Sequence, residues 1–250
     1  MSGKLIVNGI SALLLIGLTA VEAWPCRPLK TEDCGTTPHG RPALELGLEV
    51  DMLKDDTGCM LCSVFNYGLS HNWDAGIEIP FIYFNPDDGT SRSGIGDTVL
   101  RSKYRFLEET PSRPAFLVKP TFKMPNGDET RGLGSGKSDA GVLLVLTKGF
   151  GSLAGHFNLG YNMVDLPKGN KFRDNPAFLG MGFQYSLDSQ FSILGEVIYE
   201  PKVNSNNIFD SIIGVIWNAT GRTAYDLAVR VDLTDGNADH LITSGLTVNF

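Results

Sequence analysis

The final stretch of the chain, Ala238 to Phe250, alternates between apolar and small or polar side chains. Because successive side chains of a strand point to opposite faces, this alternation gives an extended segment two unlike surfaces. The apolar face consists of Ile242, Leu246, Val248 and Phe250. The other face consists of Leu241, Thr243, Gly245, Thr247 and Asn249. An aromatic residue at the end of such a strand suits a barrel that closes its last strand against its first, with aromatics at the membrane edge.

Similar alternation recurs upstream in segments near the ~9–11 residues that a tilted strand needs to cross a bilayer. We therefore predict an all-β fold, a single antiparallel up-and-down transmembrane β-barrel of about twelve strands. The segment Val142–Phe150 is apolar on both faces and fits this pattern least well. The expected strands are Ala43–Asp51, Cys59–Ser70, Asn72–Phe84, Ile95–Leu107, Ala115–Met124, Val142–Phe150, Ser152–Val164, Ala177–Leu187, Phe191–Tyr199, Ile208–Asn218, Thr223–Leu233 and the C-terminal segment.

The N-terminal residues 1–23 have the features of a secretory signal peptide. Lys4 supplies the positive charge, Ile10 to Ala20 form the apolar region, and Val21-Glu-Ala23 gives a cleavage site. The apolar run is shorter than the ~20 residues of a membrane-spanning helix. We therefore expect a signal peptide at 1–23, an N-terminal leader at 24–40 and a barrel at 41–250.

The connections between the expected strands alternate between short turns and longer polar loops. This is typical of membrane barrels, which have short periplasmic turns and long outer loops. A periplasmic lipocalin-like barrel would show the same alternation of side chains with the apolar face turned inward. The signal peptide, the loop asymmetry and the aromatics near strand ends favour the bacterial outer membrane, with its lipid as a partner.

If the polar face lines a lumen, its charges form neighbouring acidic and basic walls. Two interpretations are about equally supported: a structural lattice of paired charges, or a small polar solute path with a basic strip. The basic strip consists of Arg101, Lys103, Arg105, Lys119 and Lys123. The candidate lumen or solute-path residues are Glu45, Glu49, Asp74, Glu78, Asp97, Arg101, Lys103, Arg105, Lys119 and Lys123. A barrel of about twelve strands lies between the ~8 strands that side chains fill and the ~16 that leave an open channel.

The remaining motifs give weaker evidence for a functional site. The segment from Gly132 to Ser138 resembles a phosphate-binding loop, but Arg131 stands where the first glycine is required, so an outer loop is favoured. Ser152 and His156 would share a strand face ~13 Å apart, too far for a nucleophile and its base.

One or two disulfides are expected in an exported chain, with three pairings open. The disulfide candidates are Cys26, Cys34, Cys59 and Cys62.

Several stretches resemble the outer-membrane barrel family named for the meta-pathway of phenol degradation, whose members are described as transporters. The resemblance lies in Arg27–Asp33, Gly94–Asp97, Lys103–Phe106, Lys123–Asp128, Gly132–Gly136 and Asp139. It implies an outer-membrane barrel that passes hydrophobic or aromatic compounds inward. Cys34 departs from the pattern of the family.

The sequence thus predicts a passive channel or transporter for small, aromatic or hydrophobic solutes. The alternative is a structural or adhesive barrel whose outer loops bind partners. We expect no enzymatic activity, because no nucleophile–base pair is found, and no cofactor or metal. The net charge of −7 argues against nucleic acid. Phe250 resembles the C-terminal signal by which the barrel assembly machinery recognises its clients.

Overall fold

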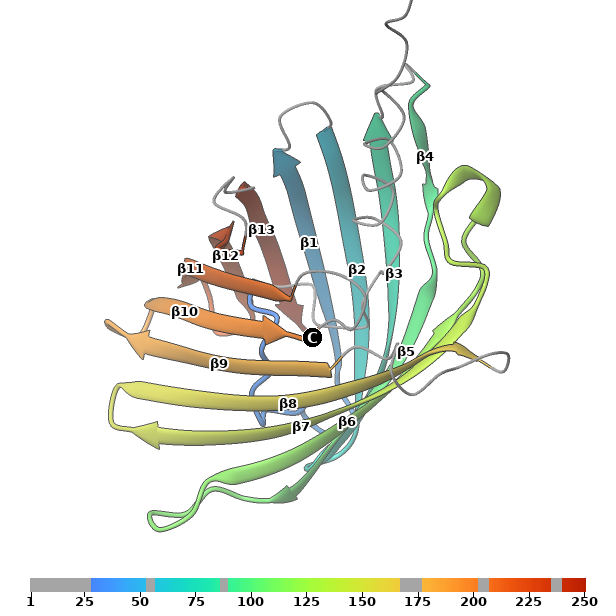
Figure 1. Cartoon of the computed structure of the whole chain (residues 1–250). Helices are drawn as coiled ribbons and strands as arrows, with labels where there is room; N and C mark the ends of the chain where they lie inside the picture. Colours follow the sequence, from blue (N-terminus) through green and yellow to red (C-terminus); the bar gives the residue numbers. More distant parts are fainter. Residues whose placement is uncertain (1–27, 53–56, 86–89, 167–176, 202–206, 235–239) are drawn as a thin grey trace, which may run out of the picture.

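The computed structural model describes residues 28–52, 57–85, 90–166, 177–201, 207–234 and 240–250. It is an antiparallel β-barrel with one extra short strand, β4 (Figure 1). The strands are β1 (Pro42–Met52), β2 (Thr57–Ser70), β3 (Trp73–Asn85), β4 (Arg92–Ile95), β5 (Thr98–Leu107), β6 (Ala115–Met124), β7 (Ser138–Phe150), β8 (Leu153–Leu166), β9 (Ala177–Ser186), β10 (Phe191–Glu200), β11 (Ile208–Asn218), β12 (Thr223–Asp232) and β13 (His240–Asn249). Within these ranges, no helix has the length and apolar character of a membrane span. The predicted signal peptide and Cys26 lie outside the described residues.

The barrel closes between its first and last strands, as the sequence predicted. β1 pairs antiparallel with β13 in an unbroken register from Ala43–Asn249 to Met52–His240. Beyond this ladder, the amide of Phe250 donates to the carbonyl of Pro42 at 3.1 Å. The sheet therefore has no free edge along this seam, which satisfies the backbone groups that lipid cannot.

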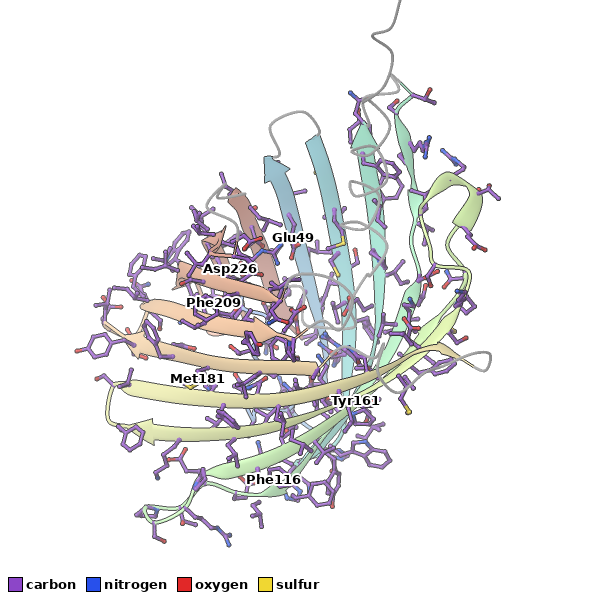
Figure 2. The ribbon with its side chains drawn as sticks, viewed as in Figure 1. Glu49, Phe116, Tyr161, Met181, Phe209 and Asp226 are labelled. Carbon is purple, nitrogen blue, oxygen red and sulfur yellow. The ribbon has the colours of Figure 1, made fainter. Side chains whose placement is uncertain are left out.

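The side chains alternate between an apolar exterior and a buried interior. Phe65, Phe122 and Leu227 are 43–51% exposed, although they are large and apolar. Their neighbours Val64, Lys123 and Asp226 are at most 6% exposed on the inner face. Figure 2 shows the side chains on the ribbon of the barrel. A lipocalin-like alternative is wrong, because it would bury the large apolar side chains inside.

The short turns gather at one end of the barrel, together with the junction of Pro42 and Phe250. Aromatic residues cluster on the outside of this end, where Trp217 stacks against Phe191 and Tyr225. Tyr104 and Phe106 form a second, edge-on contact. Such aromatics form the interfacial girdle of membrane barrels.

The predicted continuous strand Ile95–Leu107 is wrong at one point. The chain leaves the ladder at Gly96 and Asp97, so that β3 pairs with β4 through Phe81–Phe84 and with β5 through Trp73–Glu78. The interruption frees the Asp97 carboxylate to accept bonds from Gly127 and Ser135 of the loop after β6. Alternation gives no signal for this break, because its cause is a contact with a distant loop.

At the short-turn end, the leader crosses directly over Gly68 of β2. The amide of Gly40 donates to the carbonyl of Gly68 at 2.8 Å, and the amide of Gly68 donates to Arg41 at 3.1 Å. A Cβ atom at Gly68 would overlap the backbone carbonyls of Pro38 and Thr37. Only glycine therefore lets the two backbones approach this closely.

We predict that Gly68→Ala destabilises the protein by about 1–3 kcal/mol, the usual cost of overpacking. The measurement is the temperature at which the folded, heat-modifiable band converts to the unfolded band in a gel. Gly155→Ala is the control, because the nearest atom to its new Cβ lies at 4.0 Å. Equal conversion temperatures for the two variants would contradict this account of Gly68.

Candidate functional site

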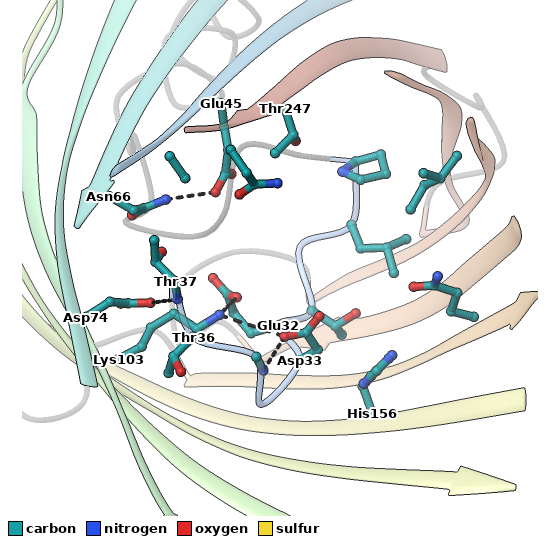
Figure 3. Close-up of a pocket in the computed structure, with 18 of the residues that line it drawn as sticks. Glu32, Asp33, Thr36, Thr37, Glu45, Asn66, Asp74, Lys103, His156 and Thr247 are labelled. Atoms are coloured by element: carbon teal, nitrogen blue, oxygen red, sulfur yellow. Dashed lines mark hydrogen bonds and ion pairs between the residues drawn. The ribbon is translucent and has the colours of Figure 1, made fainter. Parts of the chain in front are cut away.

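The leader does not merely precede the first strand; its described part, residues 28–40, lies inside the lumen. Figure 3 shows Glu32, Asp33, Thr36 and Thr37 of the leader surrounded by the barrel wall. Near the short-turn end, the amide of Thr37 donates to the Asp74 carboxylate at 2.7 Å. The alternation pattern sets residues 24–40 apart from the strands, but it does not predict where this segment lies.

Glu32 is the centre of the contact between the leader and the wall. Its two carboxylate oxygens lie 2.6 Å from the ammonium of Lys119 and 2.9 Å from that of Lys103. Its backbone exchanges two hydrogen bonds with the Asn158 side chain, at 2.7 and 2.9 Å. Burial alone would raise the pKa of Glu32, but Lys103, Lys119 and Arg101 outweigh it and lower the pKa well below its ordinary value. The carboxylate therefore stays ionised and both lysines keep their counter-charge.

A second wall residue, Glu196 on β10, binds the leader backbone. Its carboxylate accepts from the amides of Lys30 and Thr31 at 2.8 and 2.7 Å, and from the Thr31 hydroxyl at 2.7 Å. The Lys30 ammonium reaches further along the lumen, to Glu200 at 3.2 Å and Asp210 at 3.4 Å. The leader thus pairs with the basic wall through Glu32 and with the acidic wall through Lys30.

Cys34 anchors the leader by apolar packing. Its thiol donates to the Val145 carbonyl at 3.4 Å, and its amide donates to the Thr147 hydroxyl at 3.0 Å. Burial raises the pKa of this thiol. The surrounding buried cluster contains Leu117, Leu143, Val145, Phe178 and Ile198. Its β7 members explain why Val142–Phe150 is apolar on both faces: the outer side meets lipid and the inner side meets the leader.

Of the four disulfide candidates, Cys34 and Cys59 are free thiols. Cys62 is disulfide-bonded. Cys59 and Cys62 are three residues apart on β2, so their side chains point to opposite faces and cannot bridge each other. Cys34 is instead buried in the apolar cluster.

Asp97 lies in the break between β4 and β5. The other predicted lumen residues lie on the inner face of their strands, where the basic members are paired with carboxylates. Arg101 lies 3.6 Å from Glu45 and 3.5 Å from Glu78. Lys123 lies 3.7 Å from Asp97 and also contacts Asp139.

Arg105, nearer the short turns, pairs with Glu108 at 2.8 Å and donates to the carbonyls of Cys34 and His71. Glu49 is partly exposed on the inner face of β1. The basic strip is thus neutralised largely by the chain's own acids. The sequence did not predict that Glu32 of the leader pairs with this strip, or that Asn158 and Glu196 bind the leader.

The glycine-rich segment that resembles a phosphate loop folds around a carboxylate of its own chain. The Asp97 carboxylate accepts from the amides of Gly127 and Ser135 at 2.9 and 2.8 Å, and from the Ser135 hydroxyl at 2.9 Å. These donors are the kind that would hold an anion. Asp97 occupies their binding position, which supports the interpretation of the segment as a loop rather than a phosphate site.

A cavity of about 360 Å³ remains beside the leader, towards the short-turn end of the lumen. Leader residues from Pro28 to Pro38 form one side of it. The wall contributes Glu45, Asn66, Arg101 and Lys103 from one half of the barrel. Within the described residues, no group of three or more His, Cys, Asp or Glu side chains is placed to hold a metal ion. The site is therefore defined by space, charge and apolar surface.

No protein-family model and no curated protein matches this sequence. Solved structures do match its fold. The COG4313 outer membrane channel from Pseudomonas putida F1 superposes with a TM-score of 0.68 at 11% identity, covering 89% of this chain and 100% of that one. The NanC porin gives 0.59 at 11% identity, over 83% and 100% of the two chains. The CymD monoaromatic hydrocarbon channel gives 0.51 at 10% identity, over 85% and 89%.

These similarities agree with the closed barrel and its apolar exterior. The chain has the fold of outer-membrane channels, and its place is the bacterial outer membrane. The narrower resemblance to the phenol-degradation family stays a prediction.

The contact between Glu32 and Lys119 predicts a specific pattern of stability changes. Glu32→Gln should destabilise the protein by about 3–5 kcal/mol, because it leaves buried lysines without a counter-charge. Adding Lys119→Met should recover part of this loss, since it removes one of those charges. The temperature of heat-modifiable conversion and the protease sensitivity of the leader measure both effects.

Glu109→Gln is the matched control, because Glu109 forms an exposed pair with Lys148 at 2.9 Å, away from the leader. It should change stability little. A Glu32→Gln protein as stable as Glu109→Gln would show that the buried pairs do not hold the leader.

Proposed function

We propose that the protein is a passive channel for small solutes, in which the leader restricts the lumen to a narrow path. The observation that carries this proposal is the cavity of about 360 Å³ between the leader and the wall. It lies inside a barrel whose fold is that of outer-membrane channels. A volume of this order holds one small molecule.

The size of the barrel supports a restricted path rather than a wide pore. Twelve strands enclose more space than the ~8 that side chains alone can fill, but less than the ~16 of an open porin. The leader takes up part of this space. Its Glu32 pairs with Lys119 on one wall, and its backbone amides bind the Glu196 carboxylate on the other. Solutes that pass must therefore be small or must move the leader.

The lining of the cavity supports solutes with an apolar part. Leu29, Leu194 and Ile216 contribute an apolar surface to it. One neighbour, CymD, is a channel for monoaromatic hydrocarbons. We therefore include small aromatic or hydrophobic compounds, as the sequence predicted, among the solutes that this channel passes.

Planar-bilayer recording tests the proposal. Purified, refolded protein should give small, regular conductance steps in potassium chloride. Glu32→Gln should enlarge these steps roughly twofold or more, because a released leader returns lumen space to ions. The conductance of Glu109→Gln should match that of the unmodified protein, since its exposed pair lies outside the leader.

Absence of any conductance step from folded protein would contradict the proposal. It would favour the alternative, a structural or adhesive barrel. Equal steps from Glu32→Gln and the unmodified protein would leave a channel but remove the leader as its restriction.

A further inference from the structure

The cavity beside the leader has two unlike walls. Its polar wall comes from β1, β2, β3 and β5, which are neighbours in the sheet. Its apolar wall comes from Leu194 on β10 and Ile216 on β11, together with Leu29 of the leader. In the closed ring of strands, β10 lies opposite β3, so the two walls face each other across the lumen. A solute held between them meets charge on one side and hydrocarbon on the other.

The charges of the polar wall are not equally accessible. The side chains of Arg101 and Lys103 are only 5% and 14% exposed. Those of Glu45 and Asp33 are 26% and 56% exposed. The basic ends are thus covered by their own acidic partners, while carboxylate surface stays open to the lumen.

Both accessible carboxylates are engaged through one oxygen in the described part of the chain. Asp33 uses Oδ1 for the amide of Gly35 and lies 3.9 Å from the Lys103 ammonium through the same atom. Glu45 uses Oε1 to accept from Asn66 at 2.8 Å and to approach Arg101. The second oxygen of each carboxylate is available to a solute. Figure 3 shows Asp33 and Glu45 among the cavity residues.

The net formal charge of the cavity lining is also negative. Among the described residues that line the cavity, four carboxylates face two cationic side chains and one imidazole, that of His156. The carboxylates are Glu32, Asp33, Glu45 and Asp74, and the cationic residues are Arg101 and Lys103. At Asp210 the basic partners are the more exposed ones: the side chains of Lys30 and Arg230 are 19% and 22% exposed, against 6% for Asp210. Neither Lys30 nor Arg230 lines the cavity.

We propose that the channel selects small organic cations with an apolar body, such as aromatic or alkyl ammonium ions, and that Asp33 and Glu45 determine this selectivity. The ammonium group lies at the two carboxylates, and the apolar body packs against Ile216, which is only partly buried. An anion of the same shape meets carboxylates without an accessible cation to balance it. This inference rests on the proposed channel function and specifies its solute class.

A gradient of a single salt, benzyltrimethylammonium benzoate, tests the inference in planar bilayers. Both ions have one aromatic ring and carry opposite charges at pH 7, so the sign of the reversal potential shows which ion permeates better. We expect the reversal potential to have the sign that indicates greater permeability to the cation. The double variant Asp33→Asn/Glu45→Gln should lower the cation-to-anion permeability ratio on the order of tenfold, because it removes the accessible carboxylates.

Glu109→Gln and Asp188→Asn make the same chemical changes at exposed turns and should leave the ratio unchanged. Heat-modifiable gel mobility confirms that each variant is folded. If the double variant does not fold, Asp33→Asn alone gives the same test, because Asp33 lies in the leader and not in a strand.

The outcomes separate the two proposals. No current in potassium chloride overturns the channel function and this inference with it. Current in potassium chloride, combined with a reversal potential of the anion sign or with no current in the organic salt, overturns the inference alone. An unchanged ratio in the variants removes the role of Asp33 and Glu45.

Discussion

The constraint on which the structure depends is that a narrow, closed barrel must turn its charges inward and still neutralise them. Lipid excludes charged side chains from the outer face, and closure of β1 on β13 confines them to one lumen. There, Lys119 is fully buried and needs a carboxylate at close range. The leader supplies this carboxylate through Glu32, so filling the lumen and neutralising the basic wall are accomplished by the same segment.

This arrangement explains why a leader rich in proline and charge has a defined place. Its described part, residues 28–40, contains no helix or strand, and its backbone groups must therefore find partners on the wall. Glu196 accepts its amides on one side, and Asn158 exchanges hydrogen bonds with Glu32 on the other. Cys34 adds apolar contact. The leader and the barrel wall are therefore parts of one folded unit.

Much of the barrel could be predicted because its signals are local. Alternation is set by the geometry of a single strand, so the faces of β1 and β3 and the closure by β13 followed from neighbouring residues. The inner position of Arg101 and Lys119 followed in the same way. The position of Glu32 could not, because it depends on strands more than seventy residues away. The break at Asp97 and the apolar inner face of β7 share this cause, since both respond to distant segments.

The two interpretations of the lumen charges, a lattice and a solute path, are compatible in physical terms. A lattice uses each basic group for a buried pair, as Lys119 and Arg101 show. The lattice also changes the charge at the surface of the lumen, because buried cations no longer present their charge to a solute. Acids placed at the margin of the lattice, such as Asp33 and Glu45, keep exposed oxygens. The interactions that hold the leader in place therefore also determine the sign of the surface along which a solute would pass.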